Sequence, residues 1–285
     1  MASDEQQNRA AKSAPFSFLG EDVAPGTASA FDVPISAMSS GNAVGMPVRV
    51  VHGRKAGPVL FVSAAIHGDE ITGVEIVRRL LKQVSPKRLA GTLLCVPIVN
   101  VYGFVGNSRY LPDRRDLNRS FPGSATGSLA SQLAHIFHTE IIGRADFGID
   151  LHSAAIHRHN LPQIRVSAGS ERAAALAEVF GAPAIITSPL RDQSLRKVAA
   201  DTGVEMLLYE AGEGLRFDEF SVRSGVLGIL RVLRSQGMIS ARGVAPTKAP
   251  PQVCLSSKWL RAPMGGLFRS FRSDGEAVRR GDVLG

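Results

Sequence analysis

A short apolar run that ends in a cluster of polar residues constrains the fold of this chain more than any other feature. Residues 59–66 read Val-Leu-Phe-Val-Ser-Ala-Ala-Ile, which is too short and too uniformly apolar for an amphipathic helix but typical of a strand buried on both faces. The tetrapeptide His-Gly-Asp-Glu follows at 67–70, and apolar residues then recur at helical spacing up to residue 81. We therefore expect His67 and Glu70 to lie on the turn between a buried strand and a helix.

The same alternation of strand-like and helix-like segments runs through most of the chain. Expected strands lie at about 47–52, 59–66, 92–98, 146–151, 163–167, 184–187 and 204–210, and expected helices at about 70–84, 127–142, 170–180, 192–201 and 217–236. This order predicts an α/β fold with a mostly parallel or mixed central sheet flanked by helices. Ligands on such sheets gather at the carboxyl ends of the strands.

A second histidine, His152, follows the apolar run 147–151 and is also expected at a strand end. With His67 and Glu70 it supplies two imidazoles and one carboxylate, the open ligand set of a catalytic zinc site whose fourth position is left to water. Each of these residues alone is more often a hydrogen-bonded core or loop residue, and the H-x-x-E spacing is weak evidence by itself. Their combination with the two segments described next favours a metal site.

The segment 109–123 is dense in groups that bind carboxylates and polarise carbonyls. Arginine offers a planar pair of donors to a carboxylate, and asparagine offers an amide donor to the same oxygens. We expect Arg114 and Arg115 to face water on a turn, and Asn118 and Arg119 to bind an anionic substrate.

A third strand-like run, 204–210, brings Glu210 to its carboxyl end just before a glycine-rich turn. In zinc hydrolysis a carboxylate that is not a metal ligand takes a proton from the attacking water and returns it to the leaving nitrogen. Glu210 is therefore the expected general base. Glu213 competes for this role, but it follows the turn and is ranked lower.

Four motifs in this order resemble the succinylglutamate desuccinylase and aspartoacylase family, a branch of the zinc carboxypeptidase-like hydrolases. They are HGDE at 67–70, RDLNRSFPG at 115–123, DLHS at 150–153 and YEAG at 209–212. The resemblance covers about residues 45–240. It implies a zinc-carboxypeptidase-like fold with a mixed central sheet, and a single zinc ion as the cofactor.

The resemblance implies a role for each residue around this ion. His67, Glu70 and His152 would be the zinc ligands, and Glu210 the catalytic acid and base. Asp116 would lie behind a ligand histidine, where a carboxylate fixes the imidazole tautomer and strengthens it as a ligand.

The resemblance also assigns the substrate side of the site. Asn118 and Arg119 would bind the substrate carboxylate, and Arg109 would stabilise the developing oxyanion, with Arg114 as the second choice. These roles imply a hydrolase that cleaves the amide bond of a small N-acyl amino acid or a related amide that carries a carboxylate. A metallocarboxypeptidase acting on short peptides, or a catalytically silent binding protein with the same fold, remain alternatives.

The stretch 153–165 departs from the glycine-rich continuation of some deacetylase relatives, so substrate choice is expected to depend on it. It contains His157 and His159. Alternate residues of a loop rarely both reach one ion, so structural or substrate contacts are favoured over a second metal site.

The charge distribution narrows the class of partner. Lysine and arginine number 33 against 25 aspartate and glutamate, which gives a net charge of +8. The basic residues are scattered and not interleaved with aromatic residues, so we expect a small anionic amide substrate and neither nucleic acid nor membrane as a partner.

The first twenty residues lack an apolar core, no apolar stretch approaches the roughly 20 residues that span a bilayer, and the two cysteines lie far apart. A cytoplasmic location is expected.

Four parts are expected along the chain. Residues 1–25 are expected to form a flexible N-terminal arm, and residues 26–242 are expected to form the catalytic domain. Residues 243–252 are expected to form a linker rich in proline. Residues 253–285 resemble part of the small β domain of relatives, and this domain is expected to be incomplete. Its exposed strand edges favour self-association, which makes a homo-oligomer an option.

Overall fold

The computed structural model describes residues 13–247 and 249–285. Its strands are β1 (Phe16–Phe18), β2 (Glu21–Val23), β3 (Thr27–Ala37), β4 (Ala43–His52), β5 (Lys55–Ala64), β6 (Ala90–Val96), β7 (Phe147–His152), β8 (Asn160–Val166), β9 (Ala184–Thr187), β10 (Glu205–Gly212) and β11 (Gln252–Cys254). Its helices are α1 (Thr72–Gln83), α2 (Val101–Val105), α3 (Leu129–Glu140), α4 (Glu171–Phe180), α5 (Leu195–Asp201) and α6 (Glu219–Ser235), with short 3₁₀ turns η1 (Leu117–Arg119) and η2 (Ile142–Arg144).

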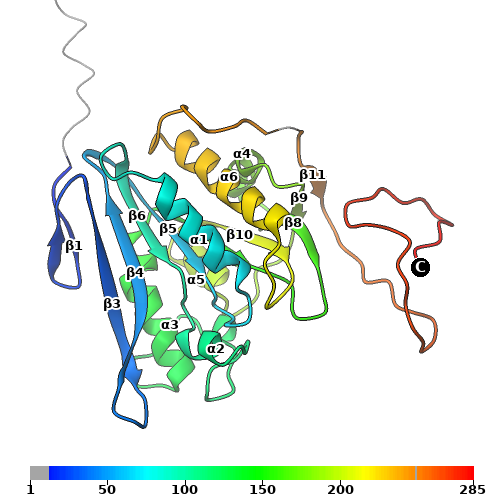
Figure 1. Cartoon of the computed structure of the whole chain (residues 1–285), viewed down its shortest axis with the longest axis horizontal. Coiled ribbons are helices and arrows are strands. Elements are labelled where there is room, and N and C mark those ends of the chain that lie inside the picture. Colours follow the sequence, from blue (N-terminus) through cyan, green and yellow to red (C-terminus); the bar gives the residue numbers. More distant parts are fainter. Residues whose placement is uncertain (1–12, 248) are drawn as a thin grey trace, which may run out of the picture.

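A nine-stranded mixed sheet forms the centre of the molecule (Figure 1), with the order β11-β9-β8-β10-β7-β5-β6-β4-β3. Strand β7 pairs in parallel with β5 on one side and with β10 on the other, whereas β8 pairs antiparallel with β10. Every residue of β7 is buried, as expected of a central strand covered on both faces. The carboxyl ends of β5, β7 and β10 therefore meet at one edge of the sheet.

Helices cover both faces of this sheet. One apolar layer joins the sheet to α1, α4 and α6, and the other joins it to α3 and α5. Four of these helices, α3, α4, α5 and α6, begin at a serine or aspartate whose side chain accepts a hydrogen bond from a backbone N–H of the first turn: Ser128, Ser170, Ser194 and Asp218. The start of each of these helices is therefore specified by one local capping residue. The apolar face of each helix then packs against the sheet.

The predicted fold class, an α/β protein with a mixed central sheet and flanking helices, is confirmed. All seven expected strands and all five expected helices are present, with ends displaced by a few residues. Strand β3 was not expected, because it has few buried positions and lies at the edge of the sheet, where hydrophobic patterning is weak.

The expected N-terminal arm is wrong for residues 16–23. These residues form the hairpin β1–β2, and its side chains Phe18 and Val23 are buried in the same apolar layer as α3. The guanidinium of Arg144 lies 5.4 Å from the centre of the Phe18 ring. The sequence signal for this hairpin is the pair of phenylalanines two residues apart, Phe16 and Phe18, because such alternation in a polar segment is typical of a strand with one buried face. Residues 1–12 of the expected arm lie outside the described residues.

The first residues of the C-terminal part of the chain belong to the central sheet. Strand β11 pairs in parallel with β9, so residues 252–254 extend the central sheet. Beyond Cys254 the described residues contain no further strand, and the chain continues as irregular loops beside the sheet (red in Figure 1). The division into a linker at 243–252 and a β domain at 253–285 stays a prediction.

Among the described residues, none of the helices combines the length and the apolar character that crossing a bilayer requires.

Candidate active site

The turn after β5 carries the first two candidate ligands. Its glycine, Gly68, packs against the backbone of α2, where an added Cβ would lie 1.9 Å from the carbonyl carbon of Gly103. Only glycine permits this approach. The backbone N–H of Glu70 donates to the carbonyl of His67 at 3.1 Å. This tight turn brings the side chains of His67 and Glu70 to the same side, as the sequence predicts.

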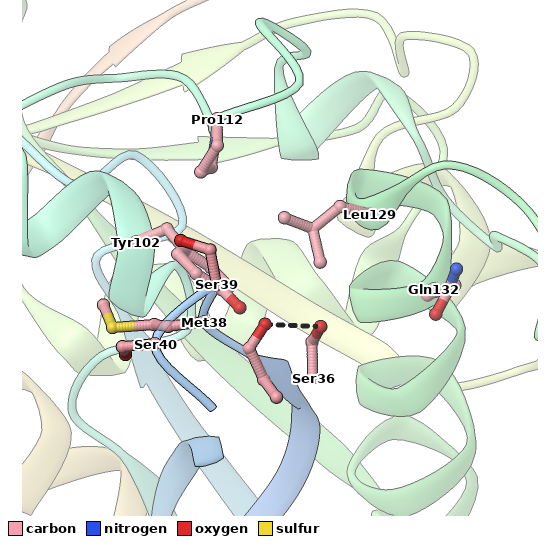
Figure 2. Close-up of a pocket in the computed structure, with 9 residues that line it drawn as sticks. Ser36, Met38, Ser39, Ser40, Tyr102, Pro112, Leu129 and Gln132 are labelled. Atoms are coloured by element: carbon pink, nitrogen blue, oxygen red, sulfur yellow. Dashed lines mark hydrogen bonds between the residues drawn. The ribbon is translucent and has the colours of Figure 1, made fainter. Parts of the chain in front are cut away.

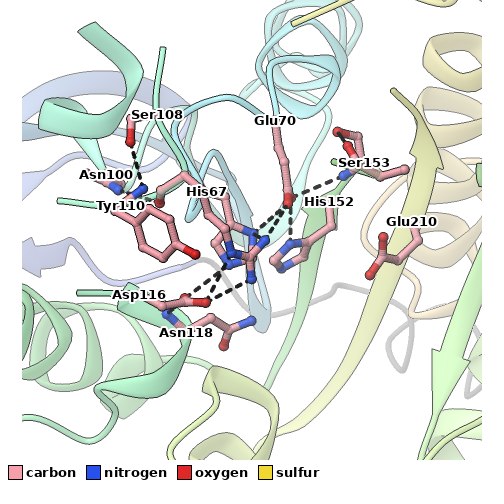
Figure 3. A network of polar contacts seen from close by, with 12 residues as sticks. His67, Glu70, Asn100, Ser108, Tyr110, Asp116, Asn118, His152, Ser153 and Glu210 are labelled. Carbon is pink, nitrogen blue, oxygen red and sulfur yellow. Dashed lines mark hydrogen bonds and ion pairs between the residues drawn. The ribbon is translucent and has the colours of Figure 1, made fainter. Parts of the chain in front are cut away.

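Both histidines converge on one carboxylate (Figure 3). His67 Nδ1 lies 2.6 Å from Glu70 Oε1, and His152 Nδ1 lies 2.8 Å from Glu70 Oε2. One candidate ligand atom from each of the three residues lies within 4.8 Å of the other two, and all three side chains are buried. The structure thus brings together, from β7 and from the turn after β5, the three residues predicted to bind a metal.

The second nitrogen of each imidazole faces another carboxylate. His67 Nε2 lies 3.3 Å from Asp116 Oδ1, and His152 Nε2 lies 2.7 Å from Asp150 Oδ2. Ser63 donates to the other oxygen of Asp150 at 2.7 Å. Metal-binding histidines characteristically donate their free N–H to a carboxylate in this way. Two imidazoles so oriented beside a buried carboxylate are a donor set that fits zinc.

The carboxylates and imidazoles of the cluster stabilise each other's charged forms. Burial opposes the ionisation of Glu70, but the neighbouring His67 and His152 outweigh it and lower the pKa of the carboxyl group. Burial also opposes the protonation of His152, but Asp150 and Glu70 outweigh it and raise the pKa of this imidazole. Glu70 is therefore a carboxylate at neutral pH, the form that binds a metal.

Arg109 lies beside this cluster, whereas Arg114 does not. The guanidinium of Arg109 donates to Asp116 Oδ2 through Nη2 at 2.9 Å, and its Nη1 lies 3.4 Å from Glu70 Oε1. Arg114 is exposed and has a left-handed backbone, with φ of 61°. Of the two arginines considered for the oxyanion, Arg109 is the one that reaches the cluster.

Glu210 lies on β10 directly across from His152 on β7. Its Oε2 accepts a hydrogen bond from Asn160 Nδ2 at 2.9 Å, and its Oε1 lies 3.6 Å from Arg165 Nη1. Burial is the main cause of a raised pKa at Glu210, and the nearby His152 and Arg165 act against it. Glu213 is held elsewhere, since its carboxylate accepts from the His157 backbone N–H at 2.9 Å.

A pocket of about 530 Å³ opens over these residues. Asn118 and Arg119, which are predicted to bind the substrate, are among the residues that line it. Asn118 Oδ1 accepts from the backbone N–H of Leu195 at 2.9 Å, which orients the side chain at the start of α5. Arg119 donates to the carbonyl of Asn118. These contacts orient both side chains in the pocket wall.

Six arginines line this pocket, and only two of them, Arg109 and Arg119, have a role predicted from the sequence. The six are Arg109, Arg119, Arg158, Arg165, Arg191 and Arg196. Arg196 is 9% exposed and donates to the carbonyl of Pro189 at 2.7 Å, while its Nη1 has no hydrogen-bond partner in the described part of the chain. Burial, with Arg165 and Arg191 nearby, lowers its pKa to about 10. The pocket is strongly positive.

The loop that follows His152 forms one side of the pocket mouth. His159 lines the pocket, and its Nδ1 lies 2.5 Å from Asp274 Oδ2 of the C-terminal segment. Trp259, from the same segment, also lines the pocket, with the guanidinium of Arg158 6.0 Å from the centre of its ring. The C-terminal segment thus contributes to the pocket wall.

Sequence reasoning missed several polar residues of the site. Asp150 had a usable signal, because residues two apart on a strand face the same side and Asp150 precedes His152 by two. Asn160 and Arg165 lie in the stretch 153–165, on which substrate choice is expected to depend, but their place beside Glu210 follows from the pairing of β8 with β10. Arg191 and Arg196 had no such signal.

A second pocket, of about 520 Å³, lies between the β3–β4 turn, α2 and α3 (Figure 2). It is lined by Ser36, Ala37, Met38, Ser39, Ser40, Tyr102, Pro112, Leu129 and Gln132. This lining offers no carboxylate, imidazole or basic side chain. The candidate active site is therefore the arginine-lined pocket, because that pocket holds the imidazoles and carboxylates that catalysis needs.

The fold and motifs match those of a known family. The family model described as succinylglutamate desuccinylase/aspartoacylase catalytic domain matches residues 56–236, well over half of the chain. The chain therefore belongs to the succinylglutamate desuccinylase/aspartoacylase family, as the motifs predicted.

Individual relatives agree with this assignment. The N-alpha-acetyl-L-2,4-diaminobutyric acid deacetylase of Halomonas elongata is 28% identical over 258 residues, a match that covers 86% of this chain and 75% of the relative. The structure of a succinylglutamate desuccinylase/aspartoacylase from Rhodobacter sphaeroides has a TM-score of 0.78 at 29% identity, covering 90% of this chain and 82% of that one. The product-bound structure of the Ectoine utilization protein of Ruegeria pomeroyi has a TM-score of 0.73 at 24% identity, and the match covers 81% of this chain and 73% of that one. At this level of identity the likeness shows the fold alone.

Proposed function

We propose that this protein is a zinc-dependent amidohydrolase that removes the acyl group from a small, anionic N-acyl amino acid. The observation that supports this function best is the convergence of His67, Glu70 and His152 in a pocket that also holds a separate carboxylate, Glu210. Two imidazoles and a carboxylate would hold the metal. When bound, zinc polarises the amide carbonyl and makes a water molecule acidic enough to ionise near neutral pH.

Glu210 would move the proton of the reaction. It accepts a proton from the water that attacks the amide carbonyl, and it donates this proton to the leaving nitrogen. Because burial raises its pKa, Glu210 is a stronger base and its protonated form persists closer to neutral pH than that of an exposed glutamate. Both properties suit a group that must act first as a base and then as an acid.

Arg109 would stabilise the negative charge that develops on the carbonyl oxygen. Its guanidinium is oriented by two donated hydrogen bonds to Asp116, at 3.1 and 2.9 Å, so it is held in place before the substrate arrives. A preoriented donor in a pocket stabilises a developing oxyanion more than solvent does. Asp116 would therefore orient Arg109 as well as His67.

The positive pocket supports an anionic substrate. Asn118 and Arg119 would bind the carboxylate of the amino acid, which places its amide over the metal site. Arg191 and Arg196 add positive charge around the remaining space. The named substrate of the Halomonas elongata deacetylase carries an amine on its side chain. We infer that this chain instead favours a substrate with a second anionic group, because a cationic side chain would be repelled.

The reaction is tested by comparing the wild-type protein with Glu210→Gln and His152→Ala. N-acetyl and N-succinyl derivatives of acidic, neutral and basic amino acids serve as substrates, alongside short peptides with a free carboxyl terminus. Glu210→Gln is expected to retain one zinc per chain and to lower kcat by about 10²–10⁴-fold. His152→Ala is expected to lose the metal. Glu213→Gln is the control and is expected to retain activity.

Two outcomes contradict the proposal. Near-normal turnover by Glu210→Gln rules out this residue as the base. A zinc-loaded wild-type protein that hydrolyses none of the substrates indicates a binding protein, and efficient cleavage of the peptides indicates a carboxypeptidase.

A further inference from the structure

The candidate base lies between two strands that contribute different groups. Strand β10 has β7, with His152, on one side and β8 on the other. Glu210 pairs with Gln163 of β8, and the register then shifts so that Gly212 pairs with Asn160. This irregularity brings the first residue of β8 close to the end of β10. Polar groups of β8 thus approach Glu210 from the side opposite the metal ligands.

Each oxygen of the Glu210 carboxylate has its own partner on β8. Asn160 Nδ2 donates to Oε2 at 2.9 Å, and Arg165 Nη1 lies 3.6 Å from Oε1. Within the described parts of the chain, the carboxylate has no other hydrogen bond or ion pair. The carboxylate is largely buried, with 14% of the side chain exposed, so water does not replace these contacts readily.

This arrangement restricts the orientation of a flexible side chain. A glutamate has three side-chain torsions, and an unanchored carboxylate would populate several rotamers. Proton transfer requires the base to lie within hydrogen-bond distance of the proton it takes. A misplacement of about 1 Å can reduce the rate by a factor on the order of 100. Contacts that fix both oxygens are therefore expected to affect turnover directly.

We propose that Asn160 and Arg165 are positioning residues that hold the carboxylate of Glu210 towards the metal site. This inference rests on the proposed role of Glu210 as the base. Asn160 fixes one oxygen through a directional hydrogen bond. Arg165 attracts the other oxygen and prevents the carboxylate from rotating towards the arginines elsewhere in the pocket.

The test measures kcat and KM separately for zinc-loaded Asn160→Ala, Arg165→Met and Arg165→Lys. The first two are expected to lower kcat by about 10–100-fold, with KM changed less than about threefold and with unchanged zinc content. Arg165→Lys keeps the positive charge and is expected to recover most of kcat. Gln163→Leu is the matched control on the same strand and is expected to behave like the wild type, because its side chain makes no hydrogen bond to Glu210 among the described residues.

A second measurement separates positioning from a general structural role. In Glu210→Asp the carboxylate is shorter and does not reach Asn160, so adding Asn160→Ala is expected to cost little further activity. Equal losses in both backgrounds contradict the proposal, as do unchanged kcat values in the single variants. A rise in KM with normal kcat indicates that Asn160 or Arg165 binds the substrate instead. Near-normal turnover by Glu210→Gln would contradict the proposed function itself, which is a distinguishable outcome.

Discussion

Each imidazole of the candidate metal centre contacts a carboxylate through its second nitrogen. For His152 this partner is Asp150, which is fully buried and is itself held by Ser63. The carboxylate fixes the tautomer that leaves Nδ1 free to face the cluster. The metal affinity of the site should therefore depend on a residue that is not itself one of the three candidate ligands.

We predict that Asp150→Asn weakens zinc binding by about 10–100-fold, because the amide does not strengthen the imidazole as a ligand. Competition with a chromophoric chelator measures the affinity. Asp146→Asn is the control, since Asp146 precedes the same strand and, among the described residues, its side chain accepts only the backbone N–H of Val59, at 2.7 Å. Equal zinc affinity in Asp150→Asn and the wild type would show that this carboxylate does not act on the metal site.

At the scale of elements, an ionic network joins the two neighbouring helices α1 and α6. Glu75 accepts from Arg78 at 2.5 Å and from Arg79 at 2.7 Å, and Arg79 also donates to Glu219 of α6. The hydrogen bond from Arg78, followed by that from Arg79, lowers the pKa of Glu75 to about 2. The network lies above the apolar contact between the helices and adds to it.

We predict that Glu75→Gln lowers the free energy of unfolding at pH 7 by about 0.5–1 kcal/mol, the usual scale for ion pairs near the surface. The pKa of Glu75 is lowered from 4.5 to about 2 in the folded state, so its contribution is complete above about pH 4.5 and is lost as the pH falls towards 2. Urea unfolding at several pH values measures the difference from the wild type, which should shrink below pH 4.5.

Glu178→Gln provides the matched control for this measurement. Glu178 is exposed on α4 and has no ion pair among the described residues, so its replacement should have little effect at any pH. A loss of stability in Glu75→Gln that is the same at pH 3 and pH 7 would mean that the charge of Glu75 does not contribute.

At the scale of the whole molecule, the candidate ligands come from parts of the chain that are distant in the sequence but adjacent in the sheet. His67 and Glu70 follow β5, and His152 ends β7, its parallel neighbour. These side chains come together only when the sheet has formed. A metal that binds all three residues therefore binds the folded protein and not the unfolded chain, so it stabilises the fold.

We predict that zinc raises the melting temperature by several degrees, since a free zinc concentration 1,000 times the Kd adds about 4 kcal/mol to the stability. Calorimetry of zinc-loaded and chelator-treated protein measures this shift, and added zinc should restore it. His152→Ala should melt at the same temperature with and without zinc. If the variant responds to zinc as strongly as the wild type, the metal binds elsewhere.

The sequence by itself determined the elements and the residues that lie at their ends. Buried strands and amphipathic helices are encoded by periodicity within about ten residues, so His67, Glu70, His152 and Glu210 were identifiable at strand ends before any contact was known. Their motifs, in the same order as in the family, added the expected roles, which stay predictions. The hairpin β1–β2 was missed because its two strands are only three residues long.

Only the tertiary structure decided which groups surround these residues. Strand β8 follows β7 in the chain, yet it pairs with β10 and β9, and this pairing brings Asn160 and Arg165 to Glu210. The fold also brings Arg109, and not Arg114, to the cluster, and it places Arg196 in the pocket wall. Strand pairing and loop packing depend on contacts between residues far apart in the chain, which local periodicity does not encode.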